Sequence, residues 1–75
     1  MRIKRSDEIT VRVYDRNKQC ILSFVDSGFR NISNVIAVAN EKTGSLLHKK
    51  PLAYELSRVS TGDRDIYNNV GLKIG

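Results

Sequence analysis

An alternation of apolar and polar residues that begins at Ile9 constrains the fold of this 75-residue chain more than any other feature. Every second residue from Ile9 to Val13 is apolar, whereas Thr10, Arg12 and Tyr14 have the opposite parity. Side chains of a β-strand point alternately to opposite faces, so this period of two predicts a strand with one buried face. The run CILSFV at residues 20–25 is almost wholly apolar and predicts a second strand. Together the two runs predict a β-hairpin.

The residues between the two runs are polar and typical of a turn. Either a two-residue turn at Arg16 and Asn17 or a four-residue loop closed by Asp15 and Cys20 is compatible with one apolar face. The predicted register pairs three apolar residues of each strand: Val13 with Cys20, Val11 with Leu22, and Ile9 with Phe24. In this register Cys20 is a small buried hydrophobic residue.

Beyond VDSG the apolar period changes from two residues to a helical spacing that begins at Phe29. We expect a helix from about Phe29 to Glu41. Asp26 or Ser27 is its expected N-cap, because short polar side chains accept hydrogen bonds from the first turn. Gly44 is the expected C-cap, in the left-handed conformation that glycine adopts readily.

The remaining segments decide the fold class. Residues 35–47 also fit a hairpin, but the helix is favoured because its apolar stripe begins earlier. Residues 51–60 fit a strand or a helix that starts at Pro51, and periodicity does not separate the two. Apolar residues of one parity from Ile66 to Ile74 predict a strand that continues to the C-terminus. With two late strands the order is ββαββ, so we predict an α+β two-layer sandwich with one helix on one face of an antiparallel sheet.

The chain is expected to form a single small domain over residues 1–75, with residues 1–7 as a flexible basic arm. A core of this size rarely supplies more than roughly 3 to 5 kcal/mol, so marginal stability or self-association is expected. No segment has the apolar length of a signal peptide or a membrane span, and one cysteine makes no internal disulfide. We therefore expect a cytoplasmic protein without a membrane partner.

The sequence contains no recognisable catalytic or metal-binding motif. His48 is the only histidine and Cys20 the only cysteine, and the motifs of phosphate loops, dinucleotide sites, zinc proteases and nucleophile elbows are missing. We expect a non-catalytic protein with no cofactor, no metal and no small-molecule substrate. A small RNA-cleaving toxin that uses only Arg, Lys and Tyr stays open as the enzyme alternative.

The basic character of the chain favours a polyanionic partner. Thirteen Lys and Arg against eight Asp and Glu give a net charge of +5, which attracts nucleic acid through long-range steering. Cations in the first hairpin and in the HKK loop, with a tyrosine that can stack on an unpaired base, predict weak backbone-directed binding of nucleic acid. The predicted binding residues are Arg12, Tyr14, Arg16, Lys18, Lys49 and Lys50. DNA and RNA are not distinguished.

A protein-binding regulator or inhibitor module, including one that acts as a homodimer, is the alternative function. It would use the open sheet face or an edge strand, with Glu8–Tyr14 and Val70–Ile74 as the expected edges. Ile21 is expected across from Arg12 on the face away from the helix, and Val25 on the same face. An apolar residue at that position predicts that a partner covers the face.

Overall fold

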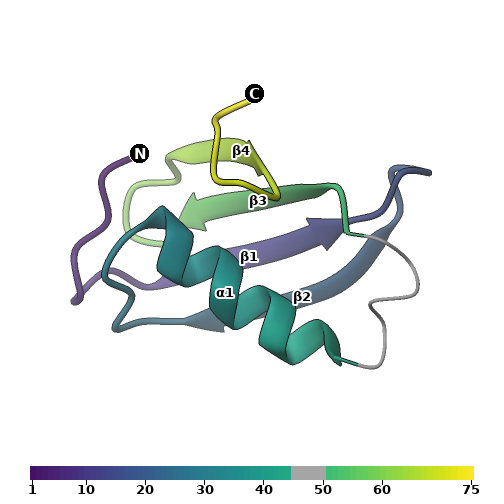
Figure 1. Cartoon of the computed structure of the whole chain (residues 1–75). Coiled ribbons are helices and arrows are strands. Elements are labelled where there is room, and N and C mark those ends of the chain that lie inside the picture. The colour runs from purple at the N-terminus through teal and green to yellow at the C-terminus, as the bar shows by residue number, and fades with distance from the viewer. Residues whose placement is uncertain (45–50) are drawn as a thin grey trace.

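The two alternating runs form a hairpin in the computed structural model, which describes residues 1–44 and 51–75. Its elements are β1 (Ile9–Tyr14), β2 (Cys20–Asp26), α1 (Ile32–Thr43), β3 (Ala53–Arg58) and β4 (Arg64–Asn68). The strands lie in the order β2-β1-β3-β4, and every neighbouring pair is antiparallel. Helix α1 crosses one face of this sheet (Figure 1). The predicted α+β sandwich of ββαββ order is confirmed, and the ambiguous segment after Pro51 forms a strand.

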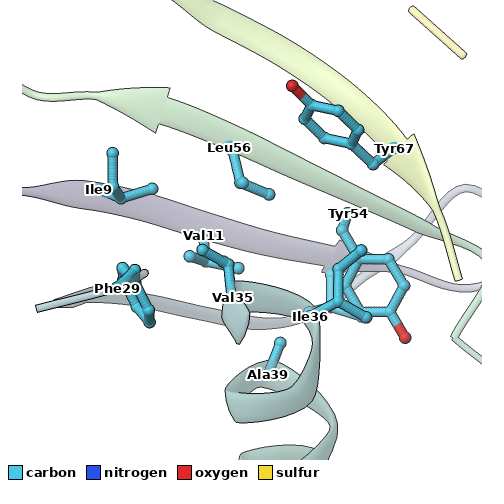
Figure 2. Close-up of a cluster of buried hydrophobic side chains, with 10 residues drawn as sticks. Ile9, Val11, Phe29, Val35, Ile36, Ala39, Tyr54, Leu56 and Tyr67 are labelled. Atoms are coloured by element: carbon cyan, nitrogen blue, oxygen red, sulfur yellow. The ribbon is translucent and has the colours of Figure 1, made fainter. Parts of the chain in front are cut away.

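The core lies between α1 and the two central strands. Figure 2 shows the apolar side chains of α1 directed toward those of β1 and β3. The buried apolar residues are Ile9, Val11, Val13, Phe29, Val35, Ile36, Ala39, Tyr54, Leu56 and Tyr67. Central strands have a neighbour on each side as well as the helix above them, which explains why Val11 and Leu56 are fully buried. The alternation of apolar and polar residues in β1 therefore predicted correctly which of its side chains are buried.

The predicted register of the hairpin is wrong by two residues. Val13 pairs with Leu22, and a β-bulge after Val13 pairs Tyr14 with Cys20. A shift of two residues keeps each side chain on its original face, so Leu22 and Phe24 still point toward the helix. The bulge moves Cys20 to the face of Tyr14, where it is exposed. The prediction of a buried Cys20 is therefore wrong.

The hairpin loop is neither of the two that the sequence suggested. It has three residues, Arg16 to Lys18, and Asp15 and Gln19 close it with a backbone hydrogen bond of 3.0 Å. Lys18 has a φ of +61°, the left-handed position that three-residue loops require. The Asp15 carboxylate accepts hydrogen bonds from the backbone N–H groups of Asn17 and Gln19. These two hydrogen bonds therefore stabilise the three-residue loop.

Helix α1 begins three residues later than predicted. Asn31 is the N-cap, and its side chain accepts a 2.8 Å hydrogen bond from the backbone N–H of Asn34. Neither Asp26 nor Ser27 caps the helix, because residues 27–30 form a loop that carries Phe29 into the core ahead of the helix. Gly44 is the C-cap as predicted, but its φ of 28° and ψ of −99° differ from the left-handed helical conformation that was expected.

The chain after β4 turns back instead of continuing as a strand. Gly71 has a φ of +85°, and the following residues run along the outer edge of β4. Ile66 donates its N–H to the carbonyl of Gly75 and accepts from the N–H of Ile74, both at 2.8 Å. The prediction of a strand that extends to the C-terminus is therefore wrong, since Asn68 ends β4.

Residues 1–7 make specific contacts on the helix side of the sheet. The N-terminal ammonium of Met1 lies 2.8 Å from the Asp65 carboxylate, and Met1 packs against the core. Arg58 contacts Asp7 at 3.2 Å and the backbone carbonyl of Arg2. The flexibility expected for this arm stays a prediction.

Candidate nucleic-acid interface

The sheet face opposite α1 carries the polar row of β1. Arg12 and Tyr14 lie on it, as predicted, because Val13 between them points to the helix. Ser23 lies across from Arg12 on β2, so the predicted pairing of Arg12 with Ile21 is wrong. On the other side of β1, Glu55 of β3 lies directly across from Arg12. The apolar neighbour that suggested a covering partner is therefore replaced by a hydroxyl and a carboxylate.

Glu55 holds two guanidinium groups on this face. The distance from its carboxylate is 3.0 Å to Arg12 and 3.7 Å to Arg64. The hydrogen bond from Arg12 to Glu55, together with the carboxylate charge, raises the pKa of Arg12. Two cations share one anion, so the cluster keeps one net positive charge. Arg64 was not predicted as part of this cluster, because only the pairing of β3 with β4 brings it beside Glu55.

A hollow of about 360 Å³ lies beside Tyr14 at one end of the helix-free face. Leu52 donates its N–H to the Tyr14 carbonyl at 2.8 Å, which places the chain before β3 next to Tyr14. The tail that returns along β4 brings Ile74 to the other side. The lining residues are Tyr14, Asp15, Lys18, Leu52, Ala53, Glu55, Ile66 and Ile74. The hollow is thus apolar inside, and its charged residues are Asp15, Lys18 and Glu55.

The predicted cations differ in how the structure places them. Lys18 lines the hollow, Arg16 is exposed on the adjacent loop, and within the described chain neither has an acidic partner. Arg12 lies two residues from Tyr14 on the same face of β1 but is paired with Glu55. Lys49 and Lys50 lie outside the described residues. The structure therefore brings Tyr14 together with Lys18, and places Arg12 and Arg16 on either side along the chain.

The basic arm does not extend this surface. Arg2 and Lys4 line a separate hollow of about 370 Å³ together with Arg58 and Asp7. Arg58 pairs with Ile9 in the β1–β3 register and therefore lies on the helix side of the sheet. The arm and the hairpin loop also lie beyond opposite ends of β1 (Figure 1). The positive charge of the arm is consequently directed away from the helix-free face.

Other kinds of site find no support in the part of the chain that the structure describes. Among residues 1–44 and 51–75, no three His, Cys, Asp or Glu side chains are close enough to hold a metal ion. The helix within these residues is too short and too polar to cross a membrane. Comparison of the chain with protein-family models, with curated proteins and with solved structures gave no match. Function is therefore inferred from the chemistry of the surface itself.

Proposed function

We propose that this protein is a non-catalytic cytoplasmic module that binds single-stranded nucleic acid weakly through the Tyr14 end of its helix-free face. The position of Tyr14 carries the proposal. Tyr14 lines a largely apolar hollow that is also lined by the exposed residue Lys18. An unpaired base stacks on the Tyr14 ring, while Lys18 and Arg16 contact neighbouring phosphates.

The charge pattern favours contacts with the nucleic-acid backbone. Four cations, Arg12, Arg64, Arg16 and Lys18, outnumber the two carboxylates of Glu55 and Asp15 around the hollow and its loop, and phosphate contacts require only such cations. No base-specific hydrogen bonding is needed for this mode, since phosphate contacts carry no direct sequence information. The expected ligand is therefore a single strand of mixed sequence.

A single strand fits this surface better than a duplex. Bases in a duplex are stacked and paired, so Tyr14 reaches a base only when that base is unpaired. Helix α1, the element that would enter a major groove, lies on the opposite side of the sheet (Figure 1). Its cation Lys42 lies 5.1 Å from the centre of the Phe24 ring. We therefore expect RNA or DNA single strands to bind more tightly than duplex DNA.

Fluorescence anisotropy with labelled mixed-sequence single-stranded RNA, single-stranded DNA and duplex DNA tests the proposal. Saturable binding of single strands is expected, with log affinity falling against log salt at a slope of about −0.7 per phosphate contact. Tyr14→Leu keeps an apolar side chain but removes the ring, and should weaken binding by about 5- to 150-fold, the range for one lost stacking contact.

A matched pair of charge variants distinguishes binding at a local site from attraction by the overall charge of the protein. Lys18→Gln and Lys42→Gln each remove one positive charge, from the hollow and from the helix respectively. Lys18→Gln should weaken binding and reduce the salt slope, whereas Lys42→Gln should leave both close to the wild-type values. Equal effects of the two variants would refute the proposed site, because binding would then depend on overall charge. No saturable binding at low salt would refute the proposal and favour the alternative of a protein-binding regulator.

A further inference from the structure

The hollow beside Tyr14 contains one carboxylate oxygen that has no partner in the described chain. Asp15 lines the hollow, although the residue is only 8% exposed. Its Oδ1 atom accepts hydrogen bonds of 2.9 and 3.0 Å from the backbone N–H groups of Asn17 and Gln19. No hydrogen bond or ion pair within residues 1–44 and 51–75 involves Oδ2. Every fully buried polar side-chain atom in these residues has a partner, so Oδ2 is open to solvent and to a ligand in the hollow.

The other carboxylate of the lining is already occupied. The Glu55 side chain accepts a hydrogen bond from Arg12 at 3.0 Å and lies 3.7 Å from Arg64. A ligand that used Glu55 would have to displace a guanidinium group. An ionised carboxylate oxygen accepts about two hydrogen bonds. Oδ1 of Asp15 already has two, so both positions on Oδ2 remain for a ligand.

Neither segment predicted to form an edge of the sheet does so, and each contributes to the hollow instead. Glu8–Tyr14 contains β1, which is a central strand, and Val70–Ile74 belongs to a tail that turns back along β4. The prediction of these two edges is therefore wrong. Tyr14 and Ile74, the last residues of the two segments, both line the hollow.

The rest of the lining suits a flat group with a polar edge. Leu52, Ala53, Ile66 and Ile74 have no polar side-chain atoms. The volume of about 360 Å³ is near the lower end for small-molecule sites, which gives room for a single base. Burial of an unpaired donor or acceptor costs free energy. The free oxygen of Asp15 pairs with donors only, because an ionised carboxylate has no hydrogen to donate.

We propose that this hollow selects guanine among the bases, an inference that rests on the proposed binding of single strands. With the base stacked on Tyr14, its Watson–Crick edge faces Asp15. That edge of guanine has two adjacent donors, N1–H and N2–H, and Oδ2 accepts both. Adenine and cytosine have one donor beside a ring nitrogen that accepts, and thymine and uracil have one donor between two carbonyl oxygens. These acceptors are repelled by the carboxylate, so the same oxygen that pairs with guanine disfavours the other bases.

Fluorescence anisotropy with a series of short DNA strands tests this preference. Each strand carries one base between abasic nucleotides, so the phosphates are identical and no second base competes. Guanine should bind about 5- to 30-fold more tightly than adenine, cytosine or thymine. This is the lower half of the range for a pair of hydrogen bonds to a base edge, since the hollow is open to water. Hypoxanthine lacks the N2 amino group of guanine and should have an intermediate affinity.

A matched pair of variants assigns the preference to one oxygen. Asp15→Asn keeps an oxygen that accepts from Asn17 and Gln19, but replaces Oδ2 by an amide donor. The preference for guanine should be lost while the loop is retained. Glu41→Gln removes the same charge from an exposed position of α1 and should keep the wild-type preference. Circular dichroism of the two variants should match that of the wild type.

Three results would contradict the reasoning at different levels. Equal affinity of the wild type for all four bases would overturn the guanine preference and leave single-strand binding intact. An unchanged preference in Asp15→Asn would overturn the assignment to Asp15. Failure of every strand in the series, and of mixed-sequence single strands, to bind at low salt would refute the proposed function and the preference together.

Discussion

The substitution Leu56→Ala is expected to remove most of the stability of this domain. Leu56 lies in central strand β3, pairs with Val11, and is 0% exposed. Truncation of a fully buried leucine costs about 2 to 5 kcal/mol, since the lost transfer free energy adds to the cost of a cavity. A core of this size supplies roughly 3 to 5 kcal/mol in total. The variant should therefore lie close to its unfolding threshold at room temperature.

Leu22→Ala is the matched control, because it removes the same atoms from the edge strand. Leu22 points to the same face but is only half-buried, so about half of that cost, roughly 1 to 2 kcal/mol, is expected. The sequence alone gave no reason to expect different costs for Leu22 and Leu56, since both are leucines in apolar runs. The difference in cost between these two variants thus tests the strand order β2-β1-β3-β4 directly.

Urea unfolding followed by circular dichroism at low micromolar concentration measures both costs. With a slope of about 1 kcal/mol per molar urea, a loss of 2 kcal/mol lowers the midpoint by about 2 M. The midpoint should fall substantially further for Leu56→Ala than for Leu22→Ala. An equal or larger effect of Leu22→Ala would refute the placement of β3 at the centre of the core and of β2 at its edge.

Three further predictions concern single contacts. Lys18→Gly should raise stability in thermal unfolding by up to about 1 kcal/mol, because glycine adopts the positive φ of 61° without strain; the same variant should bind nucleic acid more weakly. Tyr54→Phe should cost about 1 kcal/mol at neutral pH, since the hydroxyl donates to the Asn40 side chain. Burial raises the pKa of Tyr54, so wild-type stability should fall above pH 10, and it should fall less in Tyr54→Phe. The pKa of Asp65 is lowered, chiefly by its hydrogen bond to the N-terminal ammonium. The stability that this pair contributes is present at neutral pH and should be lost as pH falls below the ordinary carboxyl range. The free energy of unfolding should therefore decrease less at acid pH in Asp65→Asn than in the wild type.

The fold class could be predicted because the periodicity of side chains is a local property, although periodicity did not separate a strand from a helix at residues 51–60. The period of two in Ile9–Val13 and the helical spacing after Phe29 identified the hairpin, the helix and their buried faces. The boundaries were less certain, because Asn31 and Ser27 are both good N-caps. Only the burial of Phe29 in the core decides between them.

The candidate site was predictable in part for the same reason. Arg12 and Tyr14 share a face because they are two residues apart on one strand, and this much follows from the sequence. The pairing of Arg12 with Glu55, the approach of Arg64, and the hollow beside Tyr14 involve strands that are distant along the chain. No periodicity within one segment carries information about such contacts.

The sequence by itself determined which side chains are apolar, that the first two apolar runs are extended and that a helix follows them, and the overall positive charge. Tertiary structure alone decided that β1 is a central strand of the described sheet, that the tail lies along β4, and that β2 is an edge strand. The physical reason is that strand order depends on long-range backbone hydrogen bonds, and these bonds are made by groups that every residue shares. Side-chain patterns therefore specify the faces of this sheet, whereas the packing of the whole chain specifies its edges.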